Sequence, residues 1–158
     1  SGFSIGVFPI YPKSRGSIHL QSTKPSDNHI IKANYLSEKE DQELIIKGLR
    51  LVRKIASQSS IVSHIIREVR PGSEIKDDYG LLDYARRNGQ TSWHPISTCR
   101  MGKSKMDVVN YKLQVYGTEN LRVVDSSIMP NMPTSNTNVP SIMIGEKGAD
   151  IILENAKK

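Results

Sequence analysis

The chain has 158 residues, 37% of them hydrophobic and 24% charged, and its 22 basic and 16 acidic side chains give a formal net charge of +6. By size it is one ordinary domain, large enough to bury roughly two-thirds of its unfolded surface. This composition is typical of a soluble globular protein, and no apolar run approaches the roughly 20 residues that span a bilayer. We therefore expect no transmembrane segment.

The positive charge raises the question of a nucleic-acid or membrane surface. The basic residues are scattered, and the densest cluster is "RLVRK", with Arg50, Arg53 and Lys54. The two Phe and six Tyr are not interleaved with basic residues, as a platform for base stacking requires. This distribution indicates an ordinary solvated surface and no nucleic-acid partner.

The first residues, "SGFSIGVFPI", lack the basic region, long apolar stretch and small-residue cleavage site of a secretory signal. The only cysteine, Cys99, excludes an internal disulfide, which fits a reducing compartment. We expect a cytoplasmic location.

Two strands are predicted in the first part of the chain. In "PKSRGSIHLQS", turn residues at Pro12 and Gly16 precede apolar residues that alternate at Ile18 and Leu20, the period of a half-buried strand. The segment "HIIKANY", residues 29–35, predicts a second strand.

A helix is predicted next, over residues 37–57. Ser37 and Glu40 form a capping-box pattern at its start. Apolar and small residues then follow at helical spacing: Leu44, Gly48, Leu51 and Ile55.

Three more helices are expected. A short one covers residues 62–69 and ends before Pro71. Another runs from Asp78, as N-cap, to Asn88, with Gly89 as a left-handed C-terminal residue. In the last helix, Asn138 is the expected cap and Pro140 the first helical residue. One face of this helix carries only apolar and small residues: Ile142, Gly145, Ala149, Ile152 and Ala156.

The segment "TSWHPISTCRMG", residues 91–102, brings the only Trp, His94 and Cys99 close together in the sequence. One Cys and four dispersed His do not supply the paired ligand spacings of a structural zinc site. A Cys99 nucleophile with His94 as its base would need both side chains to converge, which a spacing interrupted by Pro95 does not favour. The residues alone favour Cys99 as a small buried hydrophobe and leave His94 between an interior hydrogen-bonded histidine and a catalytic one.

Three stretches together resemble a family signature: "WHPISTCRMG", "LQVYGTENLRVVDSSIMP" and "TSNTNVPSIMIGEKGADIIL". In order and spacing they are similar to the C-terminal signature of the glucose-methanol-choline (GMC) family of flavin-dependent alcohol oxidoreductases. The likeness is greatest to the choline-dehydrogenase-like branch. "PKSRGSIHLQS" and "NYLSEKEDQELIIKGLRLVRKI" look like the start of the same region, so the resemblance covers nearly the whole chain.

The resemblance implies an α+β fold, with an antiparallel sheet and helices on one face. Residues 1–93 would form part of the substrate-binding domain, and residues 94–158 the catalytic segment and a part that returns to the FAD domain. No two glycines are separated by a single residue, so the G-x-G-x-x-G dinucleotide fingerprint is missing. We expect an N-terminal Rossmann-type FAD domain outside this chain, and hence a fragment of a larger protein. The face of the last helix that carries Ile142 and Ile152 would pack on a sheet outside this chain and be exposed here.

The resemblance also implies the catalytic residues. His94 matches the family's base, which removes the hydroxyl proton of an alcohol while a hydride passes to N5 of the flavin. Asn136 in "TSNTN" matches its partner, which orients the substrate oxygen. The implied electron acceptor is oxygen or a quinone-like carrier.

The cofactor contacts implied by the resemblance lie in three places. Asp125 and Ser126 match the position that meets the ribityl and pyrophosphate groups of FAD. The backbone N–H groups of residues 137–139, which are Thr137, Asn138 and Val139, would stabilise negative charge on the reduced flavin. Trp93 either flanks the flavin or substrate or packs as a core aromatic.

The chain departs from the family pattern at two small positions, and another class of function stays open. Ser97 stands where the family usually has Gly, and Ser126 where it usually has Ala, which affects local backbone detail. The alternative is a non-catalytic binding or structural module that retains the family fold. The presence of both His94 and Asn136 argues against it, because a decayed site would be free to lose them.

Overall fold

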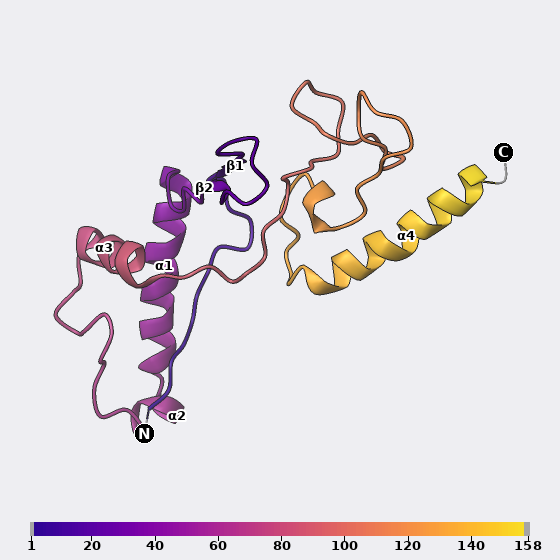
Figure 1. Cartoon of the computed structure of the whole chain (residues 1–158). Helices are drawn as coiled ribbons and strands as arrows, with labels where there is room; N and C mark the ends of the chain where they lie inside the picture. Colours follow the sequence, from indigo (N-terminus) through magenta and orange to yellow (C-terminus); the bar gives the residue numbers. More distant parts are fainter. Residues whose placement is uncertain (1, 157–158) are drawn as a thin grey trace. The chain divides into compact units, whose positions relative to one another are not determined.

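A computed structural model describes residues 2–156 of the chain (Figure 1). Its elements are β1 (Ser17–His19), β2 (Ile30–Lys32), α1 (Lys39–Ala56), α2 (Ser59–Val62), α3 (Asp78–Asn88), the 3₁₀ turn η1 (Ser126–Ile128) and α4 (Asn138–Ala156). Internal contacts divide the chain into two compact units, Ser1–Gln90 and Thr91–Lys158. The predicted α+β class is confirmed, with an antiparallel sheet and helices.

Both predicted strands are present, though each is only three residues long. β1 and β2 pair antiparallel, with Ser17 opposite Lys32 and Ile18 opposite Ile31. Gly16 lies just before β1, where a Cβ atom would collide with the backbone carbonyls of Lys32 and Ala33. A glycine is therefore required there, because only a residue without a side chain lets the two backbones approach this closely.

The helix predicted over residues 37–57 is α1, but a different face of it is covered. The predicted stripe is exposed at Leu44, Leu51 and Ile55. The half-buried apolar residues follow a neighbouring stripe: Ile45, Ile46, Leu49, Val52 and Ala56. α1 is thus apolar on both sides, and periodicity alone does not say which side the rest of this unit covers.

α3 packs against α1 (Figure 1), and its Leu81 is fully buried. The N-cap of α3 is Asp77, whose carboxylate accepts the backbone N–H of Gly80 at 2.9 Å, so the prediction of Asp78 as cap is wrong by one residue. Gly89 has φ −68° and is extended, so the predicted left-handed ending is also wrong. The chain leaves this helix directly into an extended segment.

The helix predicted over residues 62–69 is wrong, because α2 already ends at Val62. Ile66 and Val69 of the expected apolar stripe are exposed, so the stripe has no surface to pack on. The following turn is held by Arg53, whose guanidinium binds the Glu68 carboxylate at 2.8 Å. The same guanidinium also donates to the carbonyls of Gly72 at 2.9 Å and Ile75 at 2.7 Å.

The predicted capping box at the start of α1 is wrong as well. The N-cap is Glu38, and it makes no side-chain capping bond. The hydroxyl of Ser14, far away in the sequence, accepts the backbone N–H groups of Ser37 at 3.1 Å and Glu38 at 3.2 Å. A tertiary contact therefore supplies the acceptor for the Ser37 N–H, which the local pattern assigned to the Glu40 side chain.

Asp41 in the first turn of α1 completes this junction. Its side chain is 1% exposed and accepts the N–H groups of Lys13 at 2.9 Å and Ser14 at 2.7 Å, together with the Ser14 hydroxyl. Burial by itself would raise the pKa of Asp41, but these bonds outweigh it and hold the pKa below its usual value of 3.8. The ionised carboxylate fastens the segment before β1 to α1.

We expect Asp41→Asn to lower the free energy of unfolding by about 2 kcal/mol at neutral pH. The NH2 group of the amide is a donor and replaces one of the two carboxylate oxygens, so a backbone N–H group that now has an acceptor would face another donor. The folded-state pKa is depressed, so the stabilisation is present at neutral pH and is lost as the pH falls through 3.8 and below. The urea midpoints of wild type and variant should therefore converge in acid. Glu40→Gln, in the same turn but exposed, is the control and should change little. A constant difference between wild type and Asp41→Asn down to about pH 3 would contradict the linkage.

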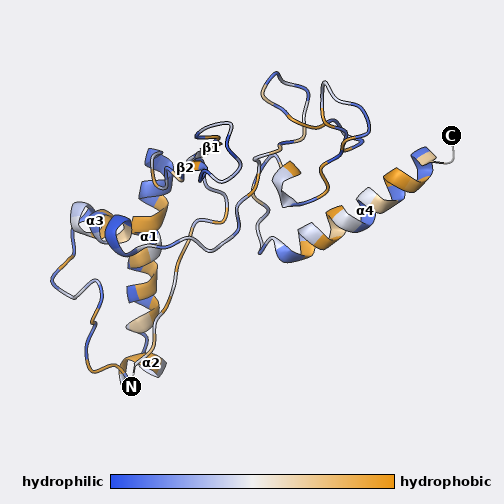
Figure 2. Cartoon of the chain, viewed as in Figure 1, coloured by the Kyte–Doolittle hydropathy of each residue, from blue (hydrophilic) through white to orange (hydrophobic). Residues whose placement is uncertain are grey.

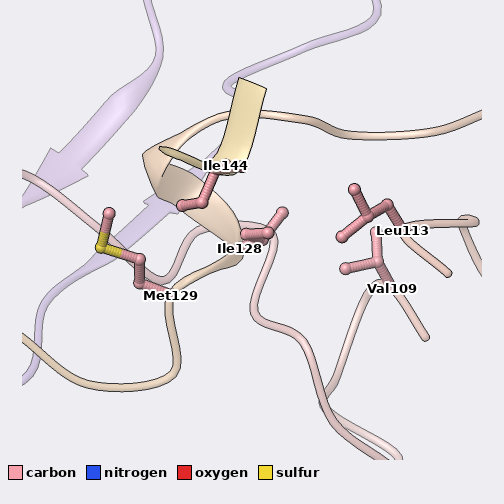
Figure 3. Close-up of a cluster of buried hydrophobic side chains, with 5 residues drawn as sticks. All are labelled: Val109, Leu113, Ile128, Met129 and Ile144. Carbon is pink, nitrogen blue, oxygen red and sulfur yellow. The ribbon is translucent and has the colours of Figure 1, made fainter. Parts of the chain in front are cut away.

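The unit from Thr91 to Lys158 has its core between irregular segments, η1 and α4. Figure 3 shows the five buried side chains, which are Val109, Leu113, Ile128, Met129 and Ile144. Gly148 of α4 lies so close to the side chains of Val124 and Leu113 that a Cβ atom would collide with Val124. The close approach of α4 to this core therefore requires glycine at 148.

The start of α4 differs from the prediction. Asn138 is the first helical residue instead of the cap, and the Thr137 carbonyl accepts the N–H of Ser141 at 2.9 Å. Pro140 is thus the third residue of the helix, where a missing N–H still costs nothing. The face of the helix that carries only apolar and small residues is exposed throughout, as expected for a face that packs on a part of the protein outside this chain: Ile142, Gly145, Ala149, Ile152 and Ala156.

A neighbouring face of α4, at Ile144, Gly148 and Ile151, packs on the core. Apolar residues consequently remain uncovered along the helix (orange in Figure 2), including Ile142 and Leu153. None of the helices described between residues 2 and 156 is sufficiently long and apolar to span a bilayer.

Candidate functional site

The segment that carries His94 is fastened to η1 and the residues after it. The backbone N–H of Cys99 donates to the Ser127 carbonyl at 3.1 Å, and that of Met101 to the Ile128 carbonyl at 2.9 Å. Ile128 belongs to the buried core. These bonds fix residues 99–101 against "DSSIMP", two stretches that the sequence separates by a long loop.

Ser97 adds a third attachment in an unusual backbone conformation. Its φ is +71°, in the left-handed region that favours glycine. This gives a physical reason for the glycine that the GMC signature usually carries here. The Ser97 hydroxyl donates to the Met129 carbonyl at 2.6 Å, a bond that a glycine would lack.

The imidazole of His94 meets the start of α4. Its Nδ1 lies 2.9 Å from the hydroxyl oxygen of Thr137. The Thr137 side chain is buried at 7% exposure, and His94 is half-buried. The structure thus brings together His94 and the "TSNTN" loop, as the resemblance implied, but the contact is made by Thr137.

The residues next to Thr137 in the sequence are all exposed: Asn136, Asn138 and Val139. Their exposure leaves the Asn136 amide and the first turn of α4 accessible to a small molecule. At a helix start the first backbone N–H groups lack partners within the helix and carry partial positive charge. Those of Asn138 and Val139 lie in this turn.

Asp125 and Ser126 lie at the beginning of η1. The Asp125 carboxylate caps that turn by accepting the Ser127 N–H at 2.7 Å. Asp125 is exposed, and Ser126 is half-buried. A capping carboxylate accepts one bond through one oxygen and can accept others, so Asp125 can bind hydroxyl groups of a ligand from this position.

Trp93 is 78% exposed and has φ +62°. It is therefore not a core aromatic within its own unit. Its backbone N–H donates to the Thr91 hydroxyl at 3.1 Å.

A loop closed by Asp107 follows the segment that carries His94. Asp107 accepts the backbone N–H of Ser104 at 2.6 Å and pairs with the Arg100 guanidinium at 2.5 Å. These two bonds, that from Ser104 first, hold the pKa of Asp107 below its usual range. These bonds tie the Arg100 side chain to the loop around Asp107.

Two other kinds of site receive no support from the residues between 2 and 156. Within that part of the chain, no three His, Cys, Asp or Glu side chains gather as a metal site would require. Cys99 is a half-buried free thiol, and its segment is held by the backbone bonds described above.

Two parts of the unit from Thr91 to Lys158 offer groups whose chemistry fits a flavin. The exposed start of α4 provides N–H donors for an anionic ring, and Asp125 provides a carboxylate acceptor for hydroxyl groups. Sequence reasoning assigned Thr137 only a backbone role and missed its hydroxyl. The signal was a β-branched hydroxyl residue next to the helix start, which is also a common capping pattern.

The comparisons with known proteins agree with one another. The family model for the GMC oxidoreductase C-terminal region, described as "GMC oxidoreductase", matches residues 12–145. An "alcohol dehydrogenase [acceptor]" from Pseudomonas putida is 43% identical over 96% of the chain and 28% of its own length. An "oxygen-dependent choline dehydrogenase" from Photobacterium profundum is 38% identical over 98% of the chain and 28% of its own length.

A solved structure of an FAD-dependent oxidoreductase from Chaetomium thermophilum matches with a TM-score of 0.88 and 25% identity, over 94% of the chain and 26% of its own length. The chain thus spans little more than a quarter of each of these proteins. It belongs to the GMC oxidoreductase family and corresponds to the C-terminal region of choline-dehydrogenase-like members.

Proposed function

We propose that the chain is the C-terminal part of an FAD-dependent alcohol oxidoreductase in which His94 takes the hydroxyl proton of the substrate. The observation that carries the proposal is the 2.9 Å contact between His94 and Thr137. Since Asn136 immediately precedes Thr137, this contact brings the two residues that match the family's catalytic pair to one small region.

His94 suits the proton step because a neutral imidazole accepts a proton at physiological pH. The alcohol's hydroxyl hydrogen goes to the imidazole as its carbon gives up a hydride, leaving a carbonyl product. FAD, when bound, supplies the hydride acceptor at its N5 atom.

Asn136 is proposed to orient the substrate by donating its amide hydrogen to the substrate oxygen. An amide donor that stays neutral binds both an alcohol and a developing alkoxide without competing for the proton. The exposed position of Asn136 at the start of α4 is compatible with this role.

The proposed cofactor contacts come from three separate segments of the chain. The N–H groups of residues 137–139 would stabilise negative charge on the reduced ring. Asp125 and Ser126 would bind the ribityl and pyrophosphate part, and exposed Trp93 would flank the ring or the substrate. The electron acceptor is oxygen or a quinone-like carrier.

The remaining partner is the rest of the protein, in which we propose an N-terminal Rossmann-type FAD domain. On this assignment residues 1–93 belong to the substrate-binding domain, and residues 94–158 carry the catalytic pair and return to the FAD domain. The exposed apolar residues of α4 are then a surface that the FAD domain covers. The cytoplasmic location and the absence of a nucleic-acid partner remain predictions.

The test of the function is flavin bleaching by alcohols in the full-length protein. We expect the flavin absorbance band to disappear on anaerobic addition of an alcohol, within a panel that includes primary aliphatic, aromatic and amino alcohols. Reoxidation by oxygen or by a quinone then identifies the acceptor class. A flavin-loaded protein that no alcohol in the panel reduces would favour the alternative, a binding or structural module of the same fold.

A further inference from the structure

The position of Thr137 is determined by the first turn of α4. The Thr137 carbonyl accepts two hydrogen bonds from Ser141, one from its backbone N–H at 2.9 Å and one from its hydroxyl at 2.6 Å. Its side chain is buried, while the residues on either side, Asn136 and Asn138, are exposed. A β-branched side chain has few rotamers, so the first turn of α4 determines where its hydroxyl oxygen lies.

The imidazole at the other end of this contact is fixed from a different element. His94 leads into the segment that is bonded to Ser127 and Ile128 in and beside η1. The His94 Nδ1 and the Thr137 hydroxyl oxygen, 2.9 Å apart, therefore belong to two segments of the same unit that are each held in place by other bonds. It is the distance of an ordinary hydrogen bond.

The direction of this hydrogen bond matters for chemistry. A neutral imidazole carries one N–H, and its other nitrogen holds the lone pair that accepts a proton. If Nδ1 carries the hydrogen and donates to the Thr137 oxygen, Nε2 is the basic nitrogen. If the threonine hydroxyl donates to Nδ1, Nε2 carries the hydrogen and the ring has no basic nitrogen to offer.

We propose that Thr137 is a positioning residue for His94, whose Nδ1–H donates to the Thr137 hydroxyl oxygen so that Nε2 faces the substrate as the base. After proton transfer to Nε2, both nitrogens carry hydrogen and Nδ1–H still donates to Thr137. The bond is then stronger, because the donor is a cation. This inference rests on the proposed function of His94, and it assigns Thr137 a side-chain role in addition to its backbone position at the helix start.

The test uses two variants of the full-length, flavin-loaded protein. Thr137→Val keeps the branched shape and removes the hydroxyl, whereas Thr137→Ser keeps the hydroxyl. We expect Thr137→Val to slow flavin reduction at saturating alcohol about tenfold, the effect of losing one neutral hydrogen bond. The alcohol concentration for half-saturation should change little, and Thr137→Ser should restore most of the rate.

The second measurement is independent of turnover. Selective ¹⁵N labelling of histidine reports which ring nitrogen carries hydrogen, and the signals missing in His94→Ala assign those of His94. We expect the Nδ1–H form in wild type and Thr137→Ser, and an increased share of the Nε2–H form in Thr137→Val. A wild-type Nε2–H form, or a Thr137→Val protein unchanged in both tautomer and rate, would overturn the proposal.

These readouts separate two failures. If His94→Ala reduces its flavin as fast as wild type, the proposed function of His94 is wrong. If His94→Ala is slow but Thr137→Val behaves as wild type, His94 stands and the positioning role of Thr137 is wrong.

Discussion

In the full-length protein, His94→Ala should slow the reduction of flavin by alcohol on the order of 10²-fold or more. A positioned general base typically contributes 10²- to 10⁴-fold to a rate, and alanine leaves no group at that place that accepts a proton. The segment that carries His94 is held by backbone bonds of Cys99 and Met101, which do not involve the imidazole, so the variant should keep its fold and its flavin content largely unchanged. The measurement is anaerobic stopped-flow absorbance of the flavin band.

Cys99→Ser is the matched control for this prediction. It lies in the same segment, and the backbone N–H of residue 99 still donates to Ser127 in the variant. The substitution replaces a half-buried thiol with a hydroxyl of similar size, so the rate should change far less than in His94→Ala. If the cysteine variant abolished turnover while the histidine variant did not, a thiol nucleophile would replace the histidine base.

The 158-residue chain, purified alone, should retain no flavin and oxidise no alcohol. Backbone N–H groups of a glycine-rich turn and a helix start normally approach the pyrophosphate of FAD, and this chain has no G-x-G-x-x-G. The groups it offers, around Asp125 and the start of α4, match one part of the cofactor. The measurement is an absorbance spectrum after incubation with excess FAD and desalting.

The full-length protein treated in the same way is the control and should keep its flavin band. The isolated chain should also self-associate, because apolar residues such as Ile142, Met143 and Leu153 are exposed on α4. Sedimentation velocity tests this. A near-stoichiometric flavin band on a monomeric, folded chain would contradict the proposal that the N-terminal FAD domain is needed to bind the cofactor.

Much of the fold could be predicted from local patterns. Alternation predicted β1, helical spacing predicted α1, and residues typical of helix ends predicted α3 and α4, because these patterns reflect the geometry of the backbone itself. The errors lie at helix ends and faces. Ser14 and Asp41, distant in sequence, hold the start of α1, and no window of sequence around Ser37 contains that information.

The packed face of α1 was mispredicted for the same physical reason. Both α1 and α4 carry apolar residues on more than one side, and which side is buried depends on the neighbouring elements. In α4 the side that contains Gly148 is buried, because the absence of a side chain there lets Val124 and Leu113 come close. Gly145, equally small, faces open space within this chain.

The sequence by itself determined the family, through motifs whose order and spacing cover nearly the whole chain, and it named His94 and Asn136 as candidates. Only the tertiary structure decided that the hydroxyl of Thr137 meets His94, since this contact joins α4 to a segment that η1 holds in place. A motif records which residues are present in the chain. The partner of each nitrogen of an imidazole depends on distances of a few ångströms between separate elements, and folding sets those distances.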